Sequence, residues 1–289
     1  MTRNFMELLR ARWSEGKFVC VGLDTDFRKI PEWFRRKVFA LEGAPLLEYN
    51  KAIVDATKDL VCAYKPNLAF YEAQGAPGIT TLQMTCEYIR EVAPGVPIIA
   101  DAKRADIGST NEGYVQFLFD YLRADATTVH PYLGREALAP FLEQEGKGIF
   151  VLCRTSNPGA GEFQDLECIT SPGYSLPLYK EAAFHVQDDW APGSTADLGL
   201  VVGATNPNEI AKVRDIASTL PFLIPGVGAQ GGDVEAAVKA GVDSRGEGII
   251  INSSRGIIFA SANGDFAEVA AQKTIELSDE INRYRSVPA

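Results

Sequence analysis

Short runs of apolar and β-branched residues alternate along the chain with longer stretches in which apolar residues recur every three or four positions. The short runs predict strands. Because most of these runs are apolar throughout, they favour strands that are buried on both faces, as in a parallel sheet. Eight strands are expected, at residues 18–24, 61–66, 97–103, 125–130, 148–153, 198–203, 222–225 and 248–252.

The amphipathic stretches predict helices, at residues 46–60, 80–92, 109–122, 134–143, 175–190, 208–218, 233–240 and 265–284, with another at 1–13. Eight strand–helix units favour an α/β fold, a closed (β/α)8 TIM barrel, which typically needs about 250 residues. We expect a single domain over residues 1–289 with inserted segments near 26–45 and 157–195. Both insertions follow strands and would lie at the end of the barrel that carries active sites. A covering role and ordinary surface elaboration both stay open for them.

Composition narrows the function. The formal net charge of −10 argues against binding to nucleic acid or to an anionic membrane, although a local field can still hold a small anion. No apolar run approaches the roughly 20 residues that span a bilayer. The five cysteines form no CxxC pair and there are only two histidines, so we expect free thiols in a reducing cytosol and no metal site.

The most informative stretch runs from Ile98 to Thr110, where a buried strand ends in charged residues. Asp101 and Lys103 are two positions apart, so on a strand their side chains point to one side, here the barrel interior. Asp106 follows in the loop. Two carboxylates around one ammonium must be paired, or they shift pKa, when they leave water. Charges at this end of a barrel strand usually serve an active site, so we favour a catalytic role over a structural ion-pair network.

Two other predicted strands also end in charged residues. Asp24 ends the first strand and Lys65 ends the second. Either residue alone could lie at the surface. Together with Asp101 and Lys103, they form a charged ring at one pole of the barrel.

Glycine-rich and basic loops follow the last two predicted strands. Residues 225–233 read PGVGAQGGD, and such glycines let the backbone approach a ligand while the next helix offers unpaired amides to an anion. Gln230 adds a side-chain donor, and Arg255 supplies a charge with a forked geometry suited to phosphate. Barrels frequently hold phosphate in these two loops. We therefore favour a phosphate site over a plain glycine turn and a surface arginine.

The same glycines match the GxGxxG pattern of dinucleotide-binding sites. That pattern usually lies in the first βα turn and needs an acidic residue after the next strand, and neither condition holds here, so we reject it. The loop after the fifth strand reads CRTSNPG and holds Ser156, which could hydrogen-bond a ligand. It contains no GxSxG nucleophile motif.

Together these residues resemble the orotidine 5′-monophosphate decarboxylase family, over most of the barrel from Val21 to Arg255. DAKRADIGST, at residues 101–110, is similar to the family's DxKxxD signature, and PGVGAQGGD is similar to its phosphate-loop motif. The signature is shared with related sugar-phosphate decarboxylases, but its combination with Lys65, the glycine-rich loop and Arg255 is highly specific. The long 157–195 segment resembles the longer bacterial-type branch.

The resemblance implies cofactor-free conversion of orotidine 5′-monophosphate (OMP) to UMP and carbon dioxide in pyrimidine biosynthesis, by a cytoplasmic homodimer with shared active sites. Lys103 would protonate C6 of the pyrimidine after carbon dioxide leaves, with Asp101 beside the substrate carboxylate. Asp106 and Thr110 would reach into the partner's site. The other implied contacts are Asp24 and Lys65 with the ribose hydroxyls, Ser156 with the pyrimidine, Gln230 and Arg255 with the 5′-phosphate, and Pro225 as a pocket wall.

Two alternatives differ in testable ways. A magnesium-dependent 3-keto-L-gulonate 6-phosphate decarboxylase, or a hexulose-phosphate synthase, is expected to carry an acidic metal ligand at the second strand, where this chain has Lys65. A non-catalytic nucleotide-phosphate-binding protein would keep Gln230 and Arg255 but would have no need for the charged residues of the DxKxxD signature.

Overall fold

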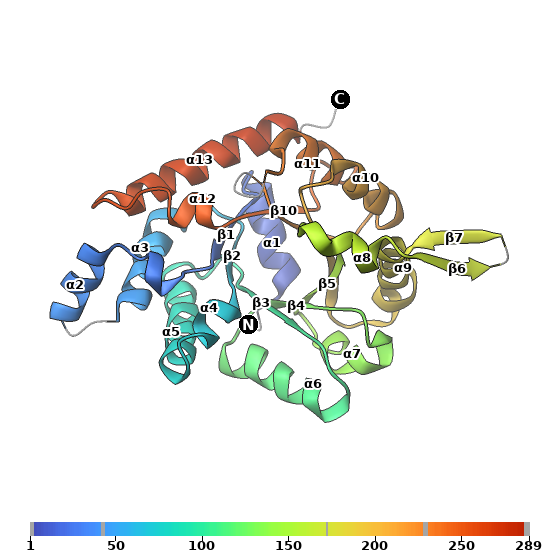
Figure 1. Ribbon diagram of the computed structural model, residues 1–289, viewed down its shortest axis with the longest axis horizontal. Helices are drawn as coiled ribbons and strands as arrows, with labels where there is room; N and C mark the ends of the chain where they lie inside the picture. The colour runs from blue at the N-terminus through green and yellow to red at the C-terminus, as the bar shows by residue number, and fades with distance from the viewer. Residues whose placement is uncertain (1–2, 42–43, 172, 228–230, 286–289) are drawn as a thin grey trace.

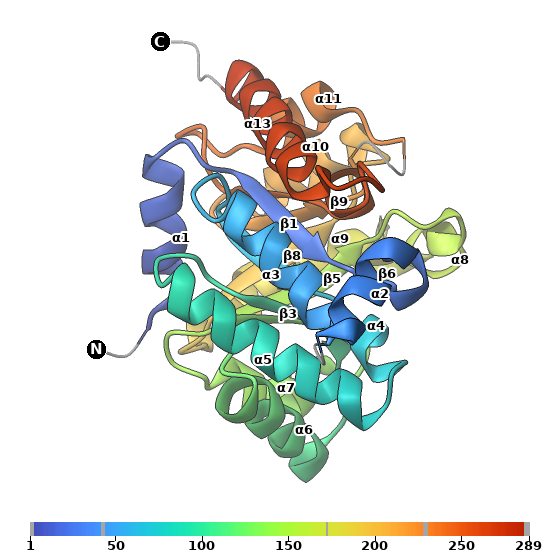
Figure 2. The ribbon, with the colours of Figure 1, turned by 90° about the vertical axis from the view of Figure 1, so that its left-hand side faces the viewer.

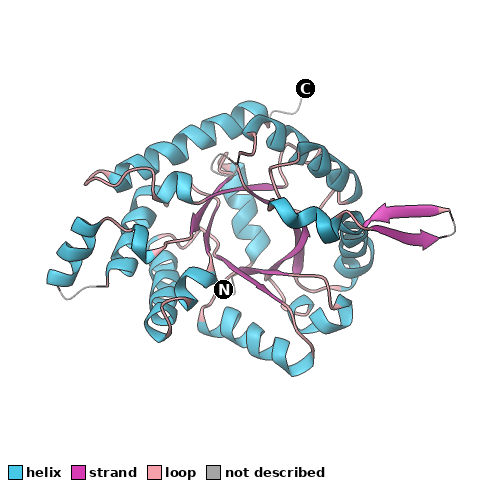
Figure 3. Ribbon diagram, in the orientation of Figure 1, coloured by secondary structure: helices cyan, strands magenta, loops and turns pink. Residues whose placement is uncertain are grey.

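Eight parallel strands surround a central core, and helices cover them on the outside, as the alternating pattern predicts (Figures 1 and 3). The computed structural model describes residues 3–41, 44–171, 173–227 and 231–285. The strands are hydrogen-bonded in the order β2-β1-β10-β9-β8-β5-β4-β3. Two isolated bridges, Tyr64 with Ile98 and Asn67 with Asp101, join the β2 side to the β3 side. The ring of strands therefore closes.

All eight predicted strands are confirmed, and no end differs from its prediction by more than two residues. They are β1 (Val19–Leu23), β2 (Ala63–Pro66), β3 (Ile99–Arg104), β4 (Ala126–Val129), β5 (Gly148–Arg154), β8 (Asp197–Val202), β9 (Phe222–Pro225) and β10 (Ile249–Ser253). Their side chains are almost entirely buried, because helices cover the outer face of the sheet and side chains fill its interior.

The helices that alternate with these strands match the predicted stretches. They are α3 (Pro45–Thr57), α5 (Ala76–Val92), α6 (Gly108–Val115), α7 (Gly134–Leu142), α9 (Leu178–Phe184), α10 (Pro207–Ile216), α11 (Val234–Gly241) and α13 (Phe266–Tyr284). Single π-helical turns, Gln116–Tyr121 and His185–Trp190, extend α6 and α9. In the described part of the chain, no helix has the length and apolar character needed to cross a membrane.

Additional elements lie mainly in the two inserted segments. The first contains the 3-10 turn Phe27–Lys29 and α2 (Glu32–Ala40); the second contains α8 (Gly161–Gln164) and an antiparallel hairpin of β6 (Glu167–Ser171) and β7 (Tyr174–Pro177). The second segment also contains the 3-10 turns Pro158–Ala160 and Ala191–Gly193, and two further short helices are α4 (Leu68–Glu72) and α12 (Arg255–Ile258). The helix predicted from Ser175 begins instead at Leu178, because Pro177 disfavours a helical conformation for the residue before it.

The two ends of the barrel have different roles. At the end where the strands begin, α1 (Phe5–Ser14) packs across the opening, and the ring of Phe5 meets Phe150 edge-on with centroids 5.6 Å apart (Figure 1). Gly148 makes room for this packing, since a Cβ there would lie 2.4 Å from the Phe5 ring. In Figure 2, α1 lies at one end of the strands, while α2, α4 and α8 lie at the other. The end where the strands finish is therefore left for a site.

Candidate active site

A cavity of about 630 Å³ opens where the strands end. Its walls include residues from or just after each of the eight barrel strands. Most of the candidate site residues predicted from the sequence lie on these walls: Asp24, Lys65, Asp101, Lys103, Ser156, Pro225 and Arg255. Parallel strands bring these residues together because their carboxyl ends meet at one end of the barrel.

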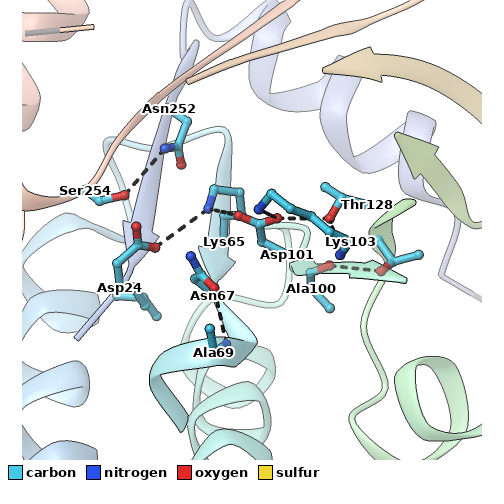
Figure 4. Close-up of polar contacts among 12 residues, drawn as sticks. Asp24, Lys65, Asn67, Ala69, Ala100, Asp101, Lys103, Thr128, Asn252 and Ser254 are labelled. Atoms are coloured by element: carbon cyan, nitrogen blue, oxygen red, sulfur yellow. Dashed lines mark hydrogen bonds and ion pairs between the residues drawn. The ribbon is translucent and has the colours of Figure 1, made fainter. Parts of the chain in front are cut away.

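Four of these side chains form a row of alternating charges, Asp24–Lys65–Asp101–Lys103 (Figure 4). The Lys65 ammonium lies 2.8 Å from one carboxylate oxygen of Asp101 and 3.7 Å from Asp24. The Lys103 ammonium lies 2.5 Å from the other oxygen of Asp101, which also accepts a hydrogen bond of 2.9 Å from the Thr128 hydroxyl. Asp101 is therefore paired on both oxygens.

Burial makes this pairing strong. Burial alone would lower the pKa of the Lys65 ammonium, but the charges of Asp101 and Asp24 outweigh it and raise that pKa above its usual value. Burial would likewise raise the pKa of the Asp101 carboxyl, but the charges and hydrogen bonds of Lys65 and Lys103 outweigh it and lower that pKa well below its usual value. Both groups therefore stay charged at neutral pH.

The backbone at Lys103 takes a form that the sequence does not predict. Its φ of 48° lies in the left-handed region, which is rare for residues other than glycine, and the register of β3 against β4 shifts between Ala100 and Arg104. The amide of Lys103 donates to the Thr128 hydroxyl at 2.9 Å. Thr128 thus holds both the Lys103 backbone and the Asp101 carboxylate. Such a backbone costs about 1–3 kcal/mol and is concentrated at functional sites. Half of the Lys103 side chain (49%) remains exposed toward the cavity mouth.

The loop that carries Asp24 is fixed by a buried polar network that the sequence analysis missed. Thr25 donates to the side-chain oxygen of Asn50 at 2.7 Å, and the Asn50 amide donates to the Tyr71 hydroxyl at 2.9 Å. Tyr71 in turn donates to the backbone oxygen of Leu23 at 3.2 Å. Both neighbours of Asp24 are thereby tied to α3 and α4. No periodicity or motif marks these residues, because they meet only through the fold.

Two pocket-lining oxygens lack a hydrogen-bond partner within the described residues. They are Oδ1 of Asp24 and Oδ1 of Asn252, and both are buried. A buried acceptor without a partner is uncommon and requires an explanation, of which a ligand is one. Two such acceptors beside the charged row suit a ligand that carries hydroxyl groups.

The predicted phosphate region lies in the same cavity. Gly226 has a φ of 100°, and its carbonyl accepts a hydrogen bond of 3.1 Å from the amide of Gly232, so the ends of this loop lie together. Arg255 begins α12 after β10 and is exposed toward the cavity. Gln230 lies outside the described residues.

Asp106 and Thr110 do not line this cavity within one chain. Asp106 is half-buried in the loop before α6 and accepts a hydrogen bond from the Ile107 amide at 2.7 Å, while Thr110 is exposed on α6. Among the described ion pairs, none joins Asp106 to Lys103. The expectation of two carboxylates around the Lys103 ammonium is thus wrong within a single chain, because among the described ion pairs Lys103 pairs only with Asp101.

Comparison with known proteins gives concordant matches. A model of the Orotidine 5′-phosphate decarboxylase / HUMPS family matches residues 17–270. The orotidine 5′-phosphate decarboxylase of Cupriavidus metallidurans is 46% identical over 282 residues, covering 97% of this chain and 98% of the relative. The solved OMP decarboxylase of Leishmania donovani has a TM-score of 0.80 at 36% identity, covering 98% of this chain and 99% of that one. The UMP synthase of that organism has a TM-score of 0.82 at 38% identity, and this chain covers 57% of its length.

The pairing of Asp101 predicts how stability depends on pH. Its pKa is lower in the folded chain than the ordinary value of 3.8, so its contribution to stability is present above that value and is lost as the pH falls below it. We expect Asp101→Asn to lower the free energy of unfolding at pH 7, and the gap from wild type to narrow toward pH 3, as measured by urea denaturation. The exposed Asp188→Asn is the control and should show no such narrowing. A difference in the free energy of unfolding that stays constant with pH would contradict the pairing of Asp101 with the two lysines.

Proposed function

This chain belongs to the orotidine 5′-phosphate decarboxylase family and converts OMP to UMP and carbon dioxide; we propose that its row of alternating charges carries out the reaction. The observation that carries the proposal is Asp101 held between two ammonium groups, with Lys103 left half exposed in the cavity. Following ultraviolet absorbance of OMP with the purified chain tests it directly.

The proposed binding mode uses the whole cavity. The 5′-phosphate lies against Arg255, with Gln230 as a second donor and Pro225 as a wall. The ribose hydroxyls meet Asp24 and Lys65, and the pyrimidine meets Ser156. Support comes from the arrangement of these groups: all of them except Gln230 line one cavity, and one Asp24 oxygen there accepts no hydrogen bond from the described residues. Binding far from the reacting carbon supplies energy that can be used at C6.

The proposed reaction breaks the bond between C6 and the carboxylate, and the electron pair stays on C6 as carbon dioxide leaves. The ammonium of Lys103 stabilises this developing carbanion and then transfers a proton to C6, which gives UMP. The neutral amine regains a proton from water, which its half-exposed side chain can reach. Asp101 lies beside the substrate carboxylate, so repulsion between like charges raises the energy of the bound substrate.

The proposal requires no metal or organic cofactor. In the magnesium-dependent relatives, an acidic metal ligand is expected at the second strand. Here that position holds Lys65, whose ammonium lies 2.8 Å from Asp101 and repels a cation. The fixed ammonium of Lys103 supplies the charge stabilisation.

The proposal includes a homodimer in which Asp106 and Thr110 complete the partner's site. In one chain both residues lie away from the cavity, Thr110 being exposed, so both are free to serve a neighbouring site. A cytoplasmic location is proposed as well, supported by five free cysteines, four of which are buried.

Lys103→Ala should abolish turnover while leaving detectable UMP binding. Loss of the proton donor and of the charge near C6 should lower kcat by at least about 10⁴-fold. Steady-state kinetics and calorimetric titration with UMP measure the two effects. The exposed Lys212→Ala is the control for loss of a lysine. Equal turnover in the Lys103 variant would refute the role of this residue.

Activity should be unchanged by chelators. We expect the rate of OMP decarboxylation to be the same in EDTA as in buffer with magnesium, because no step is assigned to a metal. Loss of activity in EDTA, restored by magnesium, would instead favour a metal-dependent sugar-phosphate decarboxylase.

Mixed dimers test the shared site. Lys103→Ala and Asp106→Ala should each be inactive alone, but a mixture of exchanging subunits should recover about one quarter of wild-type activity, because half of the dimers then hold one intact site. Mixing Lys103→Ala with Asp101→Ala is the matched control and should recover nothing, since both changes fall in one chain's part of the site. Failure of the first pair to recover, with mixed dimers shown to form, would exclude sharing.

A further inference from the structure

The inserted segment 157–195 contains the helix α8, which lies against the loop that carries Ser156. We infer that Gln164 of α8 is a positioning residue. It holds the loop so that Ser156 keeps a fixed position relative to Lys103, and so determines how the base of the substrate is bound. The inference rests on the proposed function, because it takes Ser156 as the contact to the pyrimidine. It assigns a role to a segment that sequence patterns leave open between covering the site and surface elaboration.

Gln164 contacts Thr155, the residue directly before Ser156, with both ends of its side-chain amide. The Thr155 amide donates to Oε1 of Gln164 at 2.9 Å, and Nε2 of Gln164 donates to the Thr155 hydroxyl at 2.8 Å. That hydroxyl donates onward to the side chain of Asn157 at 2.7 Å. One side chain thus fixes both the backbone and the side chain at the start of the loop.

The two hydrogen bonds between Gln164 and Thr155, here called the clamp, are supported by a buried arginine. Arg154, the last residue of β5, donates to Oε1 of Gln164 and to the carboxylate of Asp165, both at 3.3 Å. Its guanidinium also pairs with Glu209 of α10 at 2.5 Å. Paired guanidinium–carboxylate contacts of this kind are geometrically specific. Helix α8 is therefore fixed to the barrel strand and to a neighbouring helix rather than attached only by its chain ends.

The other side of the loop packs against backbone. Gly203 follows β8, and a Cβ at this position would lie 2.7 Å from the Ser156 amide nitrogen. The Gly203 amide donates to the carbonyl of Arg154 at 2.7 Å. Ser156 therefore lies between the closely approaching backbone of Gly203 and the hydrogen bonds that hold Thr155. Sideways movement of Ser156 requires the clamp to open.

This geometry matters because Ser156, Gln164 and Lys103 line the same cavity. A base that is hydrogen-bonded at Ser156 places its C6 relative to the Lys103 ammonium. A misplacement of about 1 Å can lower a rate by about 10²-fold. Loss of the clamp should therefore weaken recognition of the base and lower kcat/KM, while recognition of the phosphate and ribose stays intact.

The test compares UMP with ribose 5-phosphate, which shares the phosphate and sugar but lacks the base. In Gln164→Leu, which keeps the bulk but removes both hydrogen bonds, we expect the inhibition constant of UMP to rise about 10-fold, that of ribose 5-phosphate to stay unchanged, and kcat/KM for OMP to fall about 10- to 100-fold. Gln164→Glu keeps the acceptor for the Thr155 amide and should restore part of the UMP affinity. The exposed Glu162→Ala, on the same helix, is the control and should change neither constant.

Equal weakening of both inhibitors would overturn the inference, because it would indicate general damage to the fold. Unchanged UMP inhibition in Gln164→Leu would overturn it as well.

Should Gln164→Leu fail to fold, Thr155→Val removes one hydrogen bond of the clamp and should give a smaller shift of the UMP inhibition constant in the same direction. A wild-type chain that binds UMP but does not decarboxylate OMP would refute the proposed function. It would not refute the role of Gln164, because that role is tested by the binding of UMP alone. Binding of UMP no tighter than that of ribose 5-phosphate in wild type would refute the clamp.

Discussion

The site depends on the carboxylate of Asp101, which holds two ammonium groups at once. Lys65 lies 2.8 Å from one oxygen and Lys103 lies 2.5 Å from the other. A buried lysine without this carboxylate would tend to lose its proton, and a buried carboxylate without the lysines would tend to gain one. The contact requires β2 and β3 to be neighbours, and they are neighbours because the barrel closes between Asn67 and Asp101. Closure of the barrel between β2 and β3 therefore also brings the charges of Lys65 and Asp101 together.

The fold followed from the sequence because its signals are local. Most strands are apolar runs, and most of the intervening helices carry an apolar face, so the eight units and their order could be read without tertiary information. The hairpin β6–β7 was missed because it is exposed and carries no core-facing pattern to distinguish it from a loop. The helix start at Leu178 follows from Pro177, a local signal that the prediction did not use.

The candidate site was predicted in part. Spacing correctly placed Asp101 and Lys103 on one cavity, and the positions at strand ends brought in Asp24 and Lys65. The register shift and left-handed backbone at Lys103 depend on the Thr128 hydroxyl across β4, which no pattern along the chain reports. Supporting residues such as Asn50, Tyr71 and Gln164 act through contacts between segments that are distant in sequence or come from different elements. Such contacts exist only in the folded chain.

The row of charges also bears on how a chain with a net charge of −10 can admit an anionic nucleotide. Two carboxylates and two ammonium groups sum to zero, so the row itself presents no net repulsion at the cavity floor. Ions in solution screen exposed charges beyond about 8 Å at physiological salt. In the proposed binding mode, an arriving phosphate group therefore responds mainly to Arg255 on the cavity wall and little to distant acidic side chains. Capture of the ligand should consequently be insensitive to the acidity of the remote surface, which is free to vary for solubility.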